Sequence, residues 1–244
     1  MFEKRVRSVS SSDAISRAKL NAAKKAVEYV LDAEVIGVGT GSTVEKFIEV
    51  LARYKSDLRD RVFTGSSIDT VLKLSKLGFK VVDPLSLQKL EVYVDGADEV
   101  DPSLNMIKGG GAALTLEKLL TFYSRKRIFI VDHTKLVLRL GEKHPVPIDV
   151  LPQAVNMVLS YLMERGYNVQ IRYPHKGKYG PVVSDIGGVI IDVKVPDGTD
   201  PVVLEKELKL IPGVIETGIF INLADYVIVG YPDRSEVKVR KLSR

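Results

Sequence analysis

Cysteine is absent from this chain, and histidine is scarce. Only three of the 244 residues are histidine. Without cysteine the chain forms no disulfide framework, thiolate nucleophile, iron–sulfur cluster or cysteine zinc site. The histidines, His133, His144 and His175, show neither HxH nor HxxxH spacing, so the sequence does not predict a metal centre built from histidine.

Long apolar runs are also missing. No run reaches the roughly 18 to 20 residues that cross a bilayer, and residues 1–19 lack the apolar core of a signal peptide. We therefore expect a cytoplasmic protein that has no membrane partner.

The charge is only mildly unbalanced. The formal net charge is +5. The basic residues are spread along the chain and cluster only in residues 3–7 and 238–244. These ends are typical of solvated tails, so we expect no nucleic-acid partner. The same positive field attracts a smaller anion, such as a phosphorylated metabolite.

The residues that are present have the composition of a globular protein. Apolar residues make up 45% of the chain and charged residues 27%, a balance that differs from disordered and fibrous sequences. The length allows either one large domain or two modest ones.

Strand and helix patterns alternate over residues 13–132. Each of the last three predicted helices follows a β-favouring run, and such repeated units predict a parallel sheet. Ligands bind these sheets at the carboxyl ends of the strands. The predicted helices are 13–31, 42–55, 68–78 and 112–126, and the predicted strands are 33–39, 61–67, 80–84, 91–96 and 127–132.

From about residue 144 the order changes to β-α-β-β-α-β, which is typical of a small ferredoxin-like sheet with two helices on one face. Its predicted elements are 145–150, 152–166, 168–173, 187–195, 200–213 and 214–221. The strand pattern at 225–230 is one too many for that sheet, so we assign it to the first. The predicted fold class is α/β: a Rossmann-like parallel-sheet domain, 1–143 plus 219–244, with an inserted small ferredoxin-like α+β domain, 144–218.

The glycine-rich segment GVGTGST, residues 37–43, follows a strand and opens a helix, where backbone N–H groups favour an anion. It lacks the third glycine of GxGxxG and the lysine of a Walker loop, which disfavours dinucleotides and nucleoside triphosphates. Thr40, Ser42 and Thr43 instead suit a phosphate monoester, which Lys19 could also reach. The alternative is a plain helix cap, because Ser42 and Glu45 match the SxxE capping box.

A second candidate segment, residues 94–118, combines carboxylates, one lysine and three glycines. Asp95 ends a strand and Asp98 follows it, which places both at the mouth of the sheet. Met106 occupies the twelfth position from Asp95, so no EF-hand fits, while magnesium bound through one or two carboxylates stays open. Lys108 precedes Gly109, Gly110 and Gly111, whose N–H groups can form an oxyanion site, although a flexible loop with a solvated lysine is the alternative.

Glu117 is the candidate base. Helical spacing places it with Ala113, Leu114 and Leu120, on or near an apolar face. Burial raises the pKa of a glutamate from about 4.3 toward neutrality, which suits a general base. The plainer alternative is a surface glutamate paired with a lysine. Together with the lysine and the N–H donors, such a base suits proton abstraction next to a carbonyl through an enediolate, which needs no cofactor.

These residues resemble the type A ribose-5-phosphate isomerase family. The resemblance is carried by GVGTGST, GSS at 65–67, DGADE at 95–99, IKGGGAAL at 107–114, EK at 117–118 and DHTK at 132–135, and HPVPIDVLP and IPGV extend it past residue 143. Leu116, Ile186, Gly188 and Leu223 depart from the family pattern. The small domain of this family more often serves subunit contacts than chemistry.

The resemblance implies interconversion of D-ribose 5-phosphate and D-ribulose 5-phosphate in the non-oxidative branch of the pentose phosphate pathway, with no metal or cofactor, by a homodimer or homotetramer. Glu117 would be the base, Asp95 and Asp98 would handle hydroxyl groups and ring opening, and Lys108 would stabilise the enediolate. The substrate-binding residues would be Lys19, Thr40, Gly41, Ser42, Thr43, Ser66, Gly96, Ala97, Gly109, Gly110, Gly111 and Lys135.

Two other kinds of protein share parts of this pattern. Sugar-phosphate-sensing modules use a similar sheet but lack the base, and residues 1–30 hold too little for a helix-turn-helix reader. An acyl-CoA transferase shares glycine loops and a catalytic glutamate, but it does not predict DGADE and KGGG together.

Overall fold

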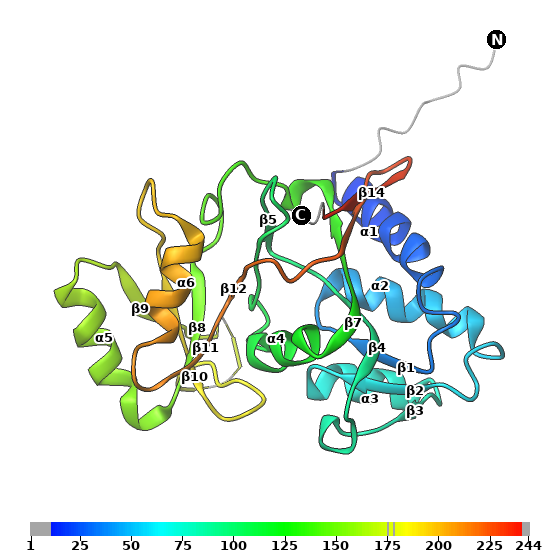
Figure 1. Cartoon of the computed structure of the whole chain (residues 1–244), viewed down its shortest axis with the longest axis horizontal. Helices are drawn as coiled ribbons and strands as arrows, with labels where there is room; N and C mark the ends of the chain where they lie inside the picture. Colours follow the sequence, from blue (N-terminus) through cyan, green and yellow to red (C-terminus); the bar gives the residue numbers. More distant parts are fainter. Residues whose placement is uncertain (1–10, 175, 178, 241–244) are drawn as a thin grey trace, which may run out of the picture.

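The computed structural model describes residues 11–240 except 175 and 178. His175 and most of the two basic ends therefore lie outside the described residues. The described residues form an α/β fold with three sheets, and Figure 1 shows the largest sheet on one side of the molecule and a four-stranded sheet on the other. None of the helices in the described part is long and apolar enough to cross a membrane.

The large sheet has seven strands in the order β14-β13-β7-β4-β1-β2-β3. All neighbouring strands are parallel except β13 and β14, which pair antiparallel. The strands are β1 (Val35–Val38), β2 (Val62–Gly65), β3 (Lys80–Val81), β4 (Leu90–Asp95), β7 (Ser124–Asp132), β13 (Tyr226–Gly230) and β14 (Ser235–Val239). The strand expected at 225–230 thus lies in this sheet, next to β7, while β14 was not predicted.

Helices cover both faces of this sheet because side chains on a strand alternate between faces. Val92 and Val94 of β4 pack in one core with α1 (Ser11–Val27) and α2 (Ser42–Leu51). Tyr93, between them, packs against Leu120 of α4 (Leu114–Phe122) on the other face. The remaining helix, α3 (Ile68–Lys76), follows β2.

The smaller sheet is antiparallel and has the order β11-β8-β10-β9. This is the ferredoxin-like arrangement that the sequence predicts. Its strands are β8 (Val146–Val150), β9 (Val169–Ile171), β10 (Val189–Val193) and β11 (Val214–Thr217). One face buries Ile191 with Leu162 of α5 (Val155–Glu164) and Leu208 of α6 (Pro201–Lys209). On the other face Ile190 packs with Leu114 at the start of α4.

A third sheet, which the sequence did not predict, has the order β12-β6-β5. It contains β5 (Glu99–Val100), β6 (Met106–Ile107) and β12 (Ile219–Phe220), and Figure 1 shows it between the other two. The single strand expected at 214–221 is divided at Gly218, whose N–H donates to Pro147 O at 2.7 Å and whose carbonyl accepts from Lys108 N at 2.9 Å. The chain therefore leaves one sheet and enters another at this glycine.

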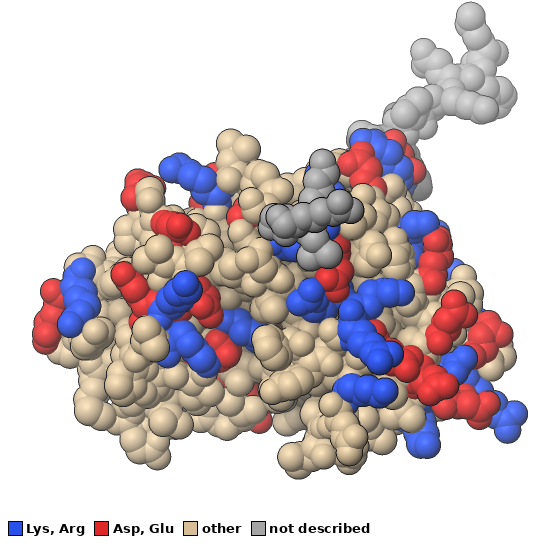
Figure 2. Space-filling model, viewed as in Figure 1, with Lys and Arg blue, Asp and Glu red and all other residues tan. Residues whose placement is uncertain are grey.

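Several predicted helices are too long: those expected at 42–55 and 200–213 end at Leu51 and Lys209. The helix expected at 13–31 ends at Val27, and α4 ends at Phe122 because residues from Ser124 onward pair with β4 as strand β7. The part of the chain that the structure describes also contains four short 3-10 turns: η1 (Ala52–Tyr54), η2 (Pro84–Ser86), η3 (His133–Lys135) and η4 (Pro152–Ala154). Figure 2 shows basic and acidic side chains interspersed on one face of the molecule.

Candidate active site

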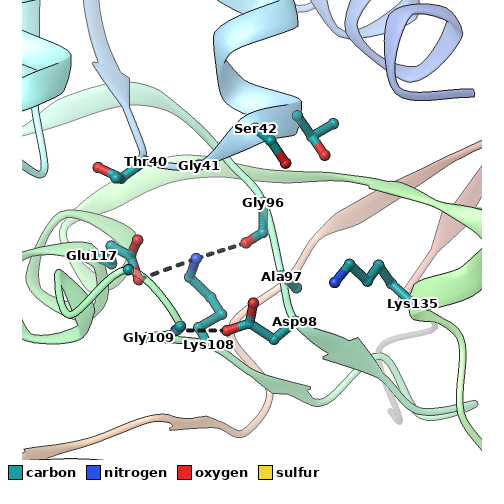
Figure 3. Close-up of a pocket in the computed structure, with 13 residues that line it drawn as sticks. Thr40, Gly41, Ser42, Gly96, Ala97, Asp98, Lys108, Gly109, Glu117 and Lys135 are labelled. Carbon is teal, nitrogen blue, oxygen red and sulfur yellow. Dashed lines mark hydrogen bonds and ion pairs between the residues drawn. The ribbon is translucent and has the colours of Figure 1, made fainter. Parts of the chain in front are cut away.

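A cavity opens at the carboxyl ends of β1, β4 and β7, where parallel sheets bind ligands. Figure 3 shows its walls. They come from the loop before α2, the segment after β4, the turn 109–112 before α4, which we call the glycine turn, and η3. The lining residues are Thr40, Gly41, Ser42, Thr43, Gly96, Ala97, Asp98, Lys108, Gly109, Gly110, Gly111, Glu117 and Lys135. All of them were candidate residues. Three further candidates, Lys19, Ser66 and Asp95, do not line it.

Glu117 faces the cavity from the first turn of α4 and is only 3% exposed. Its Oε2 atom lies 3.2 Å from Nζ of Lys108 and accepts no hydrogen bond within the described part of the chain. Burial, reinforced by the charge of Asp95 and opposed by that of Lys108, raises the pKa of Glu117 to about 8. The surface-pair alternative is wrong, because Lys118 instead contacts Glu216 at 2.9 Å.

Lys108 is the buried cation of the site, 2% exposed. Its Nζ donates to Gly96 O at 2.6 Å and lies 2.9 Å from Oδ2 of Asp95. Burial by itself lowers the pKa of this lysine, but the carboxylates of Asp95 and Glu117 outweigh that effect and raise it. The ammonium therefore stays protonated, and the solvated-lysine alternative is wrong.

Asp95 lies behind the cavity wall, fully buried. Its Oδ2 accepts from the Tyr93 hydroxyl at 2.6 Å, and its Oδ1 accepts from the N–H groups of Gly96 at 2.7 Å and Thr40 at 3.1 Å. A Cβ atom on Gly39 would lie 1.9 Å from Cγ of Asp95, so only glycine fits beside this carboxylate. From its position behind the cavity wall, Asp95 thus fixes both Lys108 and the loop between β1 and α2 (residues 39–41, the Thr40 loop). Sequence reasoning did not identify Tyr93, because an aromatic residue in a buried strand looks like ordinary core.

Asp98 lines the cavity beside the glycine turn. Its Oδ2 accepts from the N–H of Gly110 at 2.8 Å. The turn itself is closed by the N–H of Ala112, which donates to Gly109 O at 3.0 Å. This hydrogen bond therefore fixes the Asp98 carboxylate and the glycine turn relative to each other at one wall of the cavity.

The Thr40 loop contributes hydroxyl groups. Oγ1 of Thr40 lies 3.0 Å from Oγ of Ser66, 2.7 Å from Oγ of Ser67 and 3.2 Å from Oγ1 of Thr70. Ser66 therefore supports Thr40 rather than facing the cavity. Ser67 and Thr70 were missed because they belong to the next helix start, where hydroxyl residues are ordinary caps.

The start of α2 faces the cavity with Ser42 and Thr43. The N-cap residue is Gly41, with φ of 125°, and no side chain caps the helix, so the capping-box alternative is wrong. Glu45 instead contacts Lys73. Lys19 donates from Nζ to Oγ of Ser42 at 2.8 Å, which places its charge beside the helix N-terminus. This group of donors suits an anion.

Lys135 lies in η3, directly after β7, and Figure 3 shows its side chain beside Asp98 and Ala97. The turn that carries it is held at both ends. Asp132 Oδ1 accepts from Thr134 N at 3.0 Å, and Nζ of Lys143 donates to Thr134 O at 2.6 Å. No group of three or more His, Cys, Asp or Glu side chains within the described residues is placed to hold a metal ion.

Chemically, the cavity combines a carboxyl group that titrates near neutrality, a fixed ammonium and backbone N–H donors. A carboxylate with this pKa can accept a proton from carbon, and the cation and N–H dipoles can stabilise the oxygen charge that develops. The donors at the start of α2 lie apart from this centre and suit the phosphate of the same small molecule.

Comparisons with known proteins point to one family. The sequence profile of ribose 5-phosphate isomerase A (phosphoriboisomerase A) matches residues 62–234. The ribose-5-phosphate isomerase A of Aeropyrum pernix is 50% identical over 198 residues, covering 80% of this chain and 82% of that protein. A solved D-ribose-5-phosphate isomerase in complex with phospho-erythronic acid is 41% identical, with a TM-score of 0.88 over 93% of this chain and 99% of that one.

A second solved structure, the ribose 5-phosphate isomerase A of Methanocaldococcus jannaschii, is 37% identical, with a TM-score of 0.85 over 91% of this chain and 98% of that one. These similarities extend over both the large and the small sheet. The chain belongs to the ribose 5-phosphate isomerase A family.

Proposed function

We propose that Glu117 is the general base that carries a proton between C1 and C2 of the pentose phosphate. The overall reaction, interconversion of ribose 5-phosphate and ribulose 5-phosphate, follows from membership of the family. The observation that carries the proposal is the buried Glu117 carboxyl group, whose pKa is raised to about 8 and whose Oε2 lies 3.2 Å from Lys108.

In the conversion of the aldose to the ketose, Glu117 removes the proton from C2 as the C1 carbonyl oxygen gains negative charge. The electron pair of the C2–H bond forms the C1–C2 double bond of the enediolate. Lys108 and the N–H groups of the glycine turn stabilise the enediolate oxygens. Glu117 then returns the proton to C1. The O2 hydroxyl gives its proton to Asp98 and becomes the C2 ketone, and a proton from the same carboxyl group converts the O1 oxyanion into the C1 hydroxyl.

The two aspartates have different tasks in this proposal. Asp98 lines the cavity, so it is placed to exchange protons with sugar hydroxyl groups and to assist ring opening. Asp95 has no exposed surface, so we assign it to holding Lys108 and the Thr40 loop rather than to the hydroxyl chemistry that the family resemblance implies.

We place the substrate phosphate at the start of α2. Ser42 and Thr43 line the cavity there, and Lys19 contacts Ser42. Lys135, Ala97 and Gly96 line the wall along the sugar. The complex of a 41% identical isomerase with phospho-erythronic acid supports a phosphorylated sugar derivative as the ligand of this cavity.

Three further assignments belong to the same proposal. Residues 144–218 form a small domain inserted into a large one, 1–143 plus 219–244, and the separate apolar cores of the two larger sheets support this division. The protein assembles as a homodimer or homotetramer. The cytoplasmic location expected from the sequence stays a prediction.

The proposed chemistry needs only side chains and backbone, which leads to a simple test. We expect the purified protein to interconvert the two pentose phosphates at an unchanged rate after dialysis against EDTA. The measurement is the rate of ribulose 5-phosphate formation with and without chelator. Complete loss of turnover on chelation, restored by added divalent metal, would contradict the proposal.

A further inference from the structure

Arg172 reaches the glycine turn of the cavity from the small sheet, where it follows β9 directly. Its Nη1 atom donates to the carbonyl oxygen of Gly109 at 2.7 Å and of Gly110 at 3.2 Å. Its Nε and Nη2 atoms donate to the two carboxylate oxygens of Asp192 on β10. The arginine side chain is 18% exposed and that of Asp192 is 9% exposed, so this is a largely buried two-pronged ion pair with a fixed direction.

Each carbonyl group that Arg172 binds shares a peptide group with the N–H of the following residue. The Gly109 carbonyl is paired in this way with the Gly110 N–H, and the Gly110 carbonyl with the Gly111 N–H. A hydrogen bond to the oxygen of an amide polarises the whole group and strengthens its N–H as a donor. The Gly110 N–H donates to Asp98 Oδ2 at 2.8 Å. Gly111 lines the cavity, and no described residue accepts from its N–H, so that donor is free for a ligand.

The backbone conformation of the glycine turn also needs stabilising contacts from outside the turn. Gly109 has φ of 101° and Ala112 has φ of 62°, and an alanine rarely adopts this left-handed region. A Cβ atom on Gly109 would lie 2.8 Å from Cγ of Pro147, so the turn packs closely against β8 of the small sheet. Arg172 adds two hydrogen bonds to this contact and fixes the direction of the peptide groups.

We propose that Arg172, oriented by Asp192, is a positioning residue for the isomerisation. It holds the glycine turn so that the N–H of Gly111 faces the enediolate oxygens while the N–H of Gly110 holds Asp98, and its charge strengthens both donors. This inference rests on the proposed function and adds to it a positioning task for the small sheet, which the family resemblance associates with subunit contacts.

Substitution of Arg172 tests the role. We expect Arg172→Ala to lower kcat by roughly 10- to 100-fold and to change KM less than about threefold, because weakening oxyanion donors affects the transition state more than the bound substrate. We expect Arg172→Lys to stay close to Arg172→Ala, because an ammonium cannot pair with both oxygens of Asp192 and also reach two carbonyl groups. Added guanidinium ion should restore part of kcat to Arg172→Ala but not to Arg172→Lys.

Arg127→Ala is a matched control. Arg127 makes the same kind of two-pronged pair with Asp225, at 3.0 Å from Nε and 2.6 Å from Nη2, but it lies in the large sheet away from the turn. This variant loses a comparable ion pair and should keep the wild-type kcat. A kcat of Arg172→Ala equal to that of Arg127→Ala would overturn the proposal.

A second measurement does not depend on turnover. In folded protein labelled with [¹⁵N]glycine, Arg172→Lys should move the amide proton signals of Gly110 and Gly111 upfield, because weaker polarisation makes weaker donors. Unchanged shifts for both glycines would overturn the proposed polarisation. If the wild-type protein itself fails to isomerise the pentose phosphates, the proposed function fails, and the glycine shifts still decide whether Arg172 acts on the turn.

Discussion

Glu117 and Lys108 are ionisable groups that water hardly reaches, and the charge of Lys108 needs a carboxylate partner in that position. Removing one member of a buried pair leaves an uncompensated charge, which destabilises a protein by roughly 3–5 kcal/mol. Here Lys108 lies between two carboxylates, Asp95 at 2.9 Å and Glu117 at 3.2 Å. The lysine thus has a carboxylate partner in Asp95 even when Glu117 is protonated, so the base can change charge during a reaction cycle.

The raised pKa of Glu117 predicts a pH dependence. Only the ionised carboxylate can accept a proton, and with a pKa of about 8 the ionised fraction of the free enzyme rises with pH through that value. We therefore expect kcat/KM to fall by about tenfold per pH unit well below pH 8 and to level off above it. Initial rates measured across about pH 6 to 9.5 check this, and a profile that is flat from pH 6 upward contradicts it.

The sequence predicted those residues of the site that occur in short motifs. Glu117 was identified because helical spacing places it with apolar residues, and burial of its side chain follows from that. Asp95 was placed at the mouth of the sheet because it ends a strand, and its task with the sugar hydroxyl groups came from the family resemblance. Its partners Tyr93 and Thr40 come from the same strand and from a separate loop, and their convergence behind the wall depends on the tertiary structure.

At the scale of elements, the site depends on how closely α1 and β13 approach. Gly230, the last residue of β13, packs directly under α1, where a Cβ atom would lie 1.9 Å from the backbone oxygen of Ala18. Lys19, the next residue of α1, contacts Ser42 at the proposed phosphate position. The helix cannot move away from this glycine without moving that lysine.

We expect Gly230→Ala to lower both stability and substrate affinity. The added methyl group meets backbone rather than a flexible side chain, so overpacking should destabilise the protein by about 1–3 kcal/mol. For a chain of this length that corresponds to a fall in Tm of roughly 2–4 °C for each kcal/mol. Thermal unfolding and KM for the pentose phosphate are the measurements, with the exposed Ser75→Ala on α3 as control. An unchanged Tm would contradict the close contact.

The parallel sheet and the small antiparallel sheet follow from hydrophobic periodicity, and the third sheet does not. Its strands β5, β6 and β12 are each two residues long, which is too short for any alternation to be visible. β5 and β6 pair with each other across a short turn, and β12 joins them because the chain after Gly218 passes beside Lys108. That approach depends on packing between residues over 100 positions apart.

For the molecule as a whole, the cavity lies where segments of the large sheet and the glycine turn meet, and the small sheet packs against that turn. Large apolar side chains remain exposed on the single chain, among them Phe122 at 66%, Tyr123 at 58% and Leu210 at 80%. Such side chains are common in subunit contacts. This is the observation within the structure that supports the proposed oligomer.

We expect the protein in solution to have two or four times the 27.0 kDa mass of one chain. Closed symmetric dimers and tetramers are the commonest assemblies of identical chains. Light scattering coupled to size-exclusion chromatography measures this mass directly, over a range of concentrations. A single species at the mass of one chain would contradict the proposed assembly while leaving the chemistry of the cavity untouched.

The measurement that tests the central claim most directly is the turnover of Glu117→Gln. The amide keeps the shape of the side chain but cannot accept the proton, so we expect kcat to fall by roughly 10²- to 10⁴-fold. Binding of ribose 5-phosphate, measured by calorimetry, should stay within a few-fold of wild type. Glu49→Gln makes the same change at an exposed glutamate of α2 and should keep full activity. A Glu117→Gln variant that turns over within tenfold of wild type would contradict the account.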